Sequence, residues 1–406
     1  MLRIHKSFWT LFLLIASPYL VFAQNESRIY QDADQFMRVG NYDMAVEAFS
    51  HIRNLPDVDY KITICSLMSS KNYRIPLSDY LVFEGKKDPL FQYWLGKIYL
   101  KQNKTDEAKN AFVDFISTNK NNSKLTTYIE EATSLKKFTS EPRSDTKIEL
   151  IESPLNSKYA EINGILFENG NKLIFASDRL KAGEFQVYLS EKGNYGWDAP
   201  KILNHQIYRL QTLNLLSNKN QWLIFEEQNK ALQQYDLADN QLVKSTTLDM
   251  PDLTGAKHIY INKYRSRVIF SKSNRENGTE IYESFKLRST GEWMDPVPIS
   301  ANINSTFDDD YPFLTEDRKQ LYFSSNRPGG LGKMDIYVVN FYDDTNTWGR
   351  PRNLGLPINS ADDDVDFKLL EEYLAMISSD RAGTAGDLDL FILKLPMESS
   401  ALITAE

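Results

Sequence analysis

The sequence has a single cysteine among its 406 residues and only four histidines. One cysteine cannot form a disulfide within the chain, so packing alone must stabilise the fold. Cys65 lies in an apolar stretch with helical spacing, which favours a small buried side chain over a reactive thiol. The histidines are far apart in sequence, and no His/Cys spacing typical of a metal site is present. They are His5, His51, His205 and His258.

The sequence also lacks an excess of positive charge, because its 47 basic residues are outnumbered by 55 acidic ones and the formal net charge is -8. A mildly acidic chain argues against nucleic acid as a partner and against docking onto anionic lipid. The sequence contains no Gly-x-Ser-x-Gly motif and no glycine-rich phosphate loop. We therefore expect no cofactor, no metal and no catalytic residue, and we expect a protein that is not an enzyme.

The one marked apolar run is at the N-terminus. Arg3 and Lys6 precede a short apolar segment, residues 8–16, and a small residue, Ala23, stands just before polar sequence. This order is typical of a secretory signal peptide over residues 1–23, and the run is short for a membrane span. No cysteine stands directly after the predicted cleavage site, which argues against a lipid anchor. We expect an exported mature chain without an integral membrane segment.

Residues 24–138 carry apolar side chains at helical spacing, broken by Gly and Asn. Two segments, 45–49 and 108–112, share the pattern Ala-x-x-Ala-Phe after a turn. Such small residues let antiparallel helices approach closely. The spacing leaves room for one degenerate unit around residues 60–83, and a helix over 125–138 is expected to cap the stack. The polar stretch 139–146 breaks the periodicity and is predicted to be a linker.

From residue 147 to residue 397 the pattern changes to short alternating runs rich in Ile, Tyr, Phe and Val, which indicate strands. A tag of Ser, Asn or Asp, and Arg follows an apolar strand four times. The tags recur roughly every 50 residues, a period typical of propeller blades, with one double step that hides a degenerate unit around Trp222. The tag arginines are Arg179, Arg275, Arg327 and Arg381.

Further parts recur with the tags and predict five blades. Trp-x-x-Pro opens an outer strand in three units, at Trp197, Trp293 and Trp348. The segment 147–151 precedes a Leu-Asn-Ser triplet as an outer strand does in later units, while the last unit stops before its own outer strand. We therefore predict that this N-terminal strand closes the ring and removes an exposed edge. Residues 398–406 are left as a tail.

These units resemble the WD40-like repeat of TolB-type propellers, most closely in residues 311–313, 321–330 and 335–337. The helical pairs resemble tetratricopeptide repeats. The combination is similar to periplasmic proteins of Bacteroidota associated with type IX secretion and gliding motility. This resemblance implies a periplasmic protein that binds envelope proteins. The chain lacks the lipobox cysteine and the OmpA-like domain of usual members, which puts direct peptidoglycan anchoring in doubt.

Carboxylates cluster at the entry to two inner strands, in Asp308–Asp310 and Asp362–Asp364. They could bind calcium, but the EF-hand spacing is missing, and turn capping or pairing with a tag arginine explains them better. Repetition once per blade indicates a structural role for a residue. We therefore expect the tag arginines to form ion pairs within or between blades. A ligand is expected at the channel mouth. The candidate binding residues there are Glu161, Asp308, Asp310, Asp364 and Asp366.

Three functional hypotheses remain. The first is a scaffold that binds envelope proteins. The second is a channel that binds a carbohydrate or a peptide. The third is a five-bladed glycosidase with two or three carboxylates in the channel. Glu161, Asp310 and Asp364 are expected at equivalent positions of their repeats, which argues against the third hypothesis because catalytic groups are usually unique to one blade.

Overall fold

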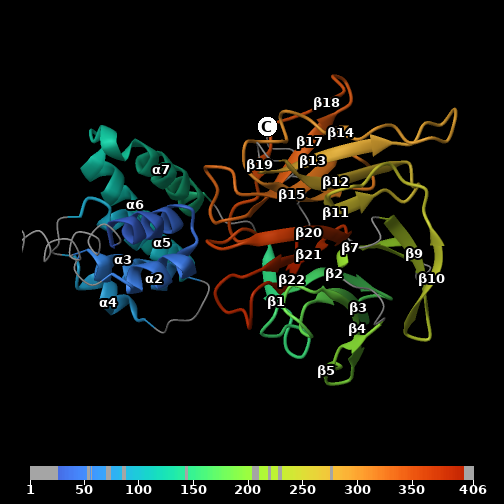
Figure 1. The fold of residues 1–406 in the computed structure, drawn as a ribbon, viewed down its shortest axis with the longest axis horizontal. Coiled ribbons are helices and arrows are strands. Elements are labelled where there is room, and N and C mark those ends of the chain that lie inside the picture. Colours follow the sequence, from blue (N-terminus) through green and yellow to red (C-terminus); the bar gives the residue numbers. More distant parts are fainter. Residues whose placement is uncertain are drawn as a thin grey trace, which may run out of the picture. The chain divides into compact units, whose positions relative to one another are not determined.

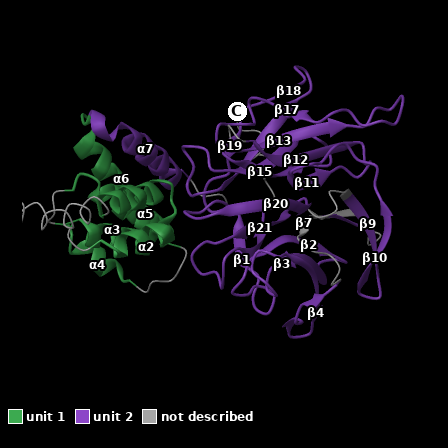
Figure 2. Cartoon of the chain, in the orientation of Figure 1, with its two compact units in different colours: residues 1–122 green, residues 123–406 purple. Residues whose placement is uncertain are grey.

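The computed structural model divides the chain into two compact units, residues 1–122 and residues 123–406 (Figure 2). Each unit is described by itself. The predicted signal peptide lies outside the described residues. The structure describes residues 26–396 except for residues 53–54, 56, 70–74, 85–87, 142–144, 204–209, 218–220, 227–230 and 275–277.

The first unit is helical, as the sequence predicts. Its elements are a helix over residues 26–38, α2 (Tyr42–Ser50), α3 (Val58–Met68), α4 (Leu77–Leu81), α5 (Phe91–Lys101) and α6 (Thr105–Asn119). Asn41 caps α2, since its side chain accepts a hydrogen bond from the backbone N–H of Met44 at 3.3 Å. Ala45, Phe49, Ala108 and Phe112 are completely buried, so the two repeated segments supply the core of this unit.

The second unit opens with a short 3₁₀ turn, η1 (Ser123–Leu125), and a last helix, α7 (Thr126–Ser140). The helix that the sequence assigns to the end of the helical array therefore belongs to the same compact unit as the strands, and it continues into the segment predicted to be a linker. The predicted domain limits stay a prediction. No helix in the described part of the chain is both long and apolar enough to cross a membrane.

Five antiparallel sheets follow. Sheet one holds β2 (Glu161–Phe167), β3 (Lys172–Ser177), β4 (Gln186–Gly193), β5 (Gly196–Trp197) and β6 (Lys201–Ile202). Sheet two holds β7 (Leu210–Ser217), β8 (Gln221–Glu226), β9 (Ala231–Ala238) and β10 (Gln241–Thr247). Sheet three holds β11 (Ala256–Ile261), β12 (Arg267–Asn274), β13 (Gly278–Phe285) and β14 (Val297–Pro298).

Sheet four holds β15 (Asp309–Leu314), β16 (Gln320–Ser325), β17 (Asp335–Tyr342), β18 (Thr347–Trp348) and β19 (Arg352–Asn353). Sheet five holds β20 (Asp364–Glu371), β21 (Leu374–Ser379), β22 (Asp389–Lys394) and β1 (Lys147–Leu150). In sheet five, β1 is antiparallel to β22, and Ile148 faces Leu393 across the pair.

The five sheets form a ring (Figure 1). The first strands of the sheets contact one another in the order β2, β7, β11, β15 and β20, and β20 returns to β2. The prediction of a five-bladed propeller is thereby confirmed, including the degenerate second blade around Trp222. Apolar side chains of neighbouring blades pack together between the sheets: Ile174 of β3 and Trp222 of β8 belong to one buried cluster. This interlocking core holds the inner strands around the axis of the ring, where the sequence predicts the channel.

Candidate functional site

The repeated tag forms a buried network at the start of the inner strands of blades one, four and five. In blade four, an Nη of Arg327 lies 2.5 Å from a carboxylate oxygen of Asp309, and Asp309 is completely buried. The same guanidinium donates to the hydroxyl of Ser325 at 3.0 Å and to the carbonyl of Ile303 at 2.6 Å. The Asp309 carboxylate also accepts the N–H of Ser305 at 2.6 Å. The arginine thus ties the loop between blades to two strands.

The network recurs in blades one and five. Arg179 pairs with Glu161 at 3.0 Å, and Arg381 pairs with Asp364; both carboxylates are completely buried. Arg275 lies outside the described residues. Glu161 and Asp364 are thus buried and engaged by tag arginines.

The prediction that Asp310 is equivalent to Glu161 and Asp364 is wrong by one residue. Glu161 faces Ser177 and Asp364 faces Ser379, and the residue that faces Ser325 in the same way is Asp309. Asp310 is the next residue, so its side chain leaves the strand on the other face. Asp310 is therefore not a repeated position, and the argument that it shares a structural role with Glu161 and Asp364 does not hold.

The three tryptophans occupy matching turns at the outer edge of their blades. Trp197, Trp293 and Trp348 each pair with the end of the third strand, opposite Lys192, Lys286 and Phe341. Trp348 is buried in the core of its blade, and the other two pack on cores at their edges. Asp308 is likewise a loop residue: its carboxylate accepts the N–H of Thr279 at 2.9 Å and joins blades three and four.

A bulge in each described inner strand turns side chains toward the channel. Asn163, Tyr311 and Asp366 occupy the same position of blades one, four and five, with φ of 58°, 52° and 57°. The pairing with the second strand shifts register at each of these places. A left-handed backbone is uncommon for a residue as large as tyrosine, and such strain concentrates at functional sites.

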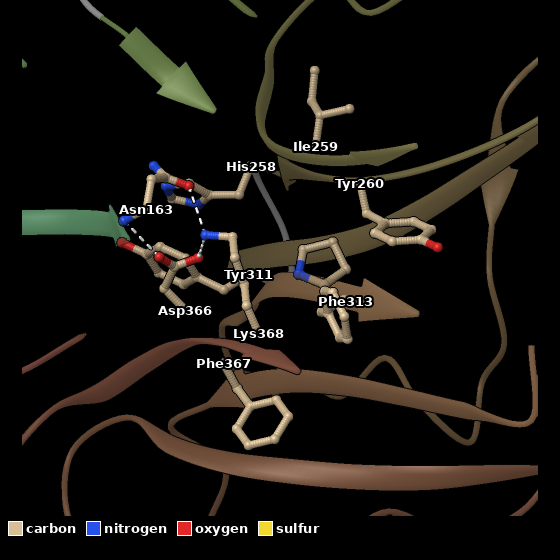
Figure 3. A pocket seen from close by; sticks show the side chains of 10 residues that line it. Asn163, His258, Ile259, Tyr260, Tyr311, Phe313, Asp366, Phe367 and Lys368 are labelled. Atoms are coloured by element: carbon tan, nitrogen blue, oxygen red, sulfur yellow. Dashed lines mark hydrogen bonds and ion pairs between the residues drawn. The ribbon is translucent and has the colours of Figure 1, made fainter. Parts of the chain in front are cut away.

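These bulges line a pocket in the channel, formed by the inner strands of blades one, three, four and five (Figure 3). Polar side chains gather on one side of the pocket, and Tyr260 and Phe313 lie apart from them. The lining residues are Asn163, His258, Ile259, Tyr260, Tyr311, Pro312, Phe313, Asp366, Phe367 and Lys368.

One half of the pocket is built around a histidine. Nδ1 of His258 lies 2.7 Å from Oδ1 of Asp310, and the same oxygen accepts the N–H of Tyr311 at 2.7 Å. The Tyr311 ring stacks on the imidazole, with the ring centres 3.7 Å apart and the planes 18° apart. No described residue bonds Nε2 of His258. The hydrogen bond to Asp310 and the stacked Tyr311 ring therefore hold the imidazole in one orientation, and its Nε2 is left for a ligand.

The other half of the pocket is built around a buried lysine. Nζ of Lys368 lies 2.6 Å from Oδ1 of Asp366 and 3.0 Å from Oδ1 of Asn163. Because an ammonium can only donate, the oxygen of the Asn163 amide must face it, and the NH₂ group points elsewhere. That Nδ2 is buried, since only 3% of Asn163 is exposed, and it has no hydrogen-bond partner among the described residues.

Burial and charge shift the acid–base behaviour of this cluster. Burial lowers the pKa of Lys368, and the neighbouring Asp366 only partly opposes this. Burial alone would raise the pKa of Asp310, but the neighbouring His258 and the hydrogen bonds from His258, Ser271 and the Tyr311 N–H hold it below its usual value. Burial and the carboxylates of Asp310 and Asp366 raise the pKa of Tyr311. Perturbed groups that converge on one cavity mark a functional-site candidate.

The structure brings together only part of the predicted site. Of the five candidate residues, Asp366 lines the pocket and Asp310 supports His258 from behind, while Glu161, Asp308 and Asp364 serve the loop networks. The sequence interpretation missed Asn163, His258, Tyr311 and Lys368. No group of three or more His, Cys, Asp or Glu side chains within the described ranges is placed to hold a metal ion.

No protein-family model matches the sequence, and no curated protein is similar to it. Many solved structures are similar in fold. TolB from Acinetobacter baumannii is 11% identical, with 67% of this chain and 70% of TolB covered and a TM-score of 0.32. The catalytic domain of a GH62 α-L-arabinofuranosidase from Coprinopsis cinerea is 9% identical, with 62% and 96% covered and a TM-score of 0.40. A luciferin-regenerating enzyme is 9% identical, with 61% and 95% covered and a TM-score of 0.35.

The expectation that the protein is not an enzyme is wrong. Two of these similar structures are enzymes by description. The expectation rested on missing nucleophile and phosphate motifs, and such motifs do not cover chemistry performed by groups from different blades. The likeness shows a propeller fold with TolB among its structural neighbours.

Proposed function

We propose that the protein is an exported cell-envelope binding protein whose propeller channel takes up a neutral polar ligand, such as a sugar or a short peptide. The buried Nδ2 of Asn163 carries this proposal. A buried donor without a partner is costly, and a ligand oxygen in the pocket would satisfy it. His258 offers a second open polar atom in the same pocket.

The composition of the pocket supports a ligand bound by hydrogen bonds and ring contacts. Tyr260, Tyr311 and Phe313 supply aromatic surface, which suits the apolar face of a sugar ring or a peptide side chain. The two carboxylates on the polar side of the pocket are already paired: Asp310 with His258, and Asp366 with Lys368. Since neither charge is left open, a neutral ligand fits better than a charged one.

The helical region and the order of the strands support the rest of the proposal. The two Ala-x-x-Ala-Phe segments suggest a tetratricopeptide-like array that binds an envelope protein, possible partners being components of type IX secretion or gliding machinery. The pairing of β1 with β22 suggests that an N-terminal strand closes the ring. The predicted signal peptide supports a periplasmic location.

Calorimetric titration of the mature chain with panels of neutral sugars and short peptides tests the ligand. We expect Asn163→Ala to weaken binding roughly twofold to tenfold, because a neutral hydrogen bond contributes about 0.5–1.5 kcal/mol. The matched control is Asn302→Ala, an exposed asparagine outside the pocket. Equal affinity in the two variants would overturn the assignment of Asn163.

Gentle cross-linking in the native envelope tests the partner. Recovery of one or two envelope proteins in stoichiometric amount, and their loss when residues 26–122 are deleted, would support the helical region as the docking part. Recovery of the protein alone would refute the scaffold role and leave the channel as the functional part.

A further inference from the structure

The histidine in the channel has the arrangement of a general base. The Asp310 carboxylate accepts a hydrogen bond from Nδ1 of His258 at 2.7 Å, so the proton of the neutral imidazole resides on Nδ1. Nε2 is then a free acceptor, and it belongs to a side chain that lines the pocket. The Asp310 carboxylate is itself fixed by the N–H of Tyr311, and the Tyr311 ring holds the imidazole plane.

Donors for a developing negative charge lie in the same pocket. The Nδ2 of Asn163 is buried beside the pocket without a partner among the described residues, and the ammonium of Lys368 has three N–H groups, of which two are used by Asp366 and Asn163. Figure 3 shows His258, Asn163 and Lys368 gathered on the same side of the pocket. Buried donors that are already oriented stabilise an oxyanion better than water does.

We propose that the His258–Asp310 pair activates a water molecule and that the channel hydrolyses carboxylic esters carried by a neutral polar ligand. The inference rests on the proposed binding function of this pocket and names the bond that is broken there. Asn163 and Lys368 bind the carbonyl oxygen of the ester. Asp310 and Tyr311 are positioning residues for His258.

The steps balance without any further reactant than water. Nε2 of His258 takes a proton from water as the hydroxide oxygen adds to the carbonyl carbon, and the π electron pair moves to the carbonyl oxygen. The tetrahedral intermediate collapses, the bond to the alkoxy oxygen breaks, and the leaving oxygen takes the proton back from Nε2. A carboxylic acid and an alcohol are released, and the imidazole is neutral again.

An ester fits these residues better than a glycosidic bond. Glycosidases need one carboxylic acid that carries a proton to the leaving oxygen. Asp310 accepts hydrogen bonds from His258 and from the backbone, and Asp366 is paired with Lys368, so neither carboxylate is free to donate a proton to a leaving oxygen. The histidine remains as the group that can exchange a proton with the substrate.

The test uses the mature full chain with 4-nitrophenyl acetate and acetylated glucose as probes. We expect turnover by the wild type, and His258→Asn should lower kcat/KM about 10²- to 10⁴-fold. The matched control is His51→Asn, an exposed histidine of the helical unit, which should keep the wild-type rate. Asp310→Asn should lower kcat with little change in KM and move the acid limb of the pH–rate profile to lower pH.

Carbethoxylation provides a second readout where a variant unfolds. Modification of His258 by diethyl pyrocarbonate, located by mass spectrometry, should abolish turnover in folded wild-type protein, and hydroxylamine should restore it. Absence of turnover in the wild type, or equal rates in the wild type and His258→Asn, overturns the hydrolytic proposal. Ligand binding without turnover would leave the proposed binding function standing alone. His258-dependent turnover without sugar or peptide binding would instead refute the ligand class.

Discussion

The guanidinium of Arg327 lies 2.5 Å from the completely buried carboxylate of Asp309, and it reaches Ser325 and the carbonyl of Ile303 at the same time. This single side chain therefore joins the inner strand, the second strand and the preceding loop of blade four. Because the arrangement recurs in blades one and five, it acts as a repeated clamp on the strand that carries the channel residues.

Loss of the Arg327 guanidinium should strongly destabilise the fold. Arg327→Met leaves the Asp309 charge buried without a partner, which typically costs about 3–5 kcal/mol. Chemical denaturation of the isolated variant measures the loss. The control Arg288→Met changes an exposed arginine of the same unit and should stay within about 0.5 kcal/mol of the wild type. Similar stabilities for the two variants would show that the network contributes little.

Stability should depend on the protonation of Asp335. Burial and the charge of Asp364 raise its pKa to about 7. The folded protein then keeps a proton that the unfolded chain releases above about pH 4, so this group destabilises the fold increasingly as the pH rises from 4 to 7. The stability of Asp335→Asn relative to the wild type should therefore rise by up to about 1.4 kcal/mol per pH unit in this window. A difference that does not change with pH would contradict this prediction.

Gly96 allows α5 to approach α6. A Cβ atom added there would lie 2.5 Å from Cε1 of Phe112, whose ring is completely buried. Gly96→Ala should therefore destabilise the helical unit by about 1–3 kcal/mol, in spite of the higher helix propensity of alanine. In a double-mutant cycle, Phe112→Leu should recover part of this loss. Additive effects would show that the close approach is not required.

Cys65 should be a reporter of unfolding. Its side chain is completely buried, and burial raises the pKa of the thiol to about 12. The thiolate is the reactive species, so we expect slow reaction with Ellman's reagent at pH 8 and fast reaction in denaturant. A fast reaction in native buffer would mean that α3 opens readily.

The role of β1 can be tested at Ile148, which packs on the core of blade five and faces Leu393. Ile148→Asp should expose the edge of β22, lower the stability by about 1–3 kcal/mol and promote aggregation. Glu149→Gln alters an exposed ion pair with Lys394 and should change little. Size-exclusion chromatography and denaturation measure both effects. Equal behaviour would argue against closure by this strand.

The architecture was predictable from the sequence because it depends on repeated features. The tags mark the end of the second strand, and the tryptophans mark the outer turn, so their period predicts five blades even though blade two has lost its tag. Periodicity does not define the register to a single residue. Three consecutive aspartates, Asp308–Asp310, offered no local signal to tell which one begins β15.

The site was less predictable because it does not repeat. Asp310, His258, Lys368 and Asn163 come from four different blades and meet only when the ring forms. The bulges add to the difficulty, since a left-handed residue interrupts the alternation that assigns side chains to faces. One signal in the sequence was His258 itself, one of only four histidines, in the region where the pattern predicts strands.

The pairing of β1 with β22 has a consequence for the order of folding. Glu149 and Lys394, which form an ion pair across these strands, are separated by 245 residues along the chain. If blade five completes only after this long-range contact forms, each molecule passes through a stage in which four blades have formed and the fifth still lacks one strand. Contacts between residues this far apart form slowly. During synthesis, β1 therefore stays unpaired until β22, near the end of the chain, has also been made.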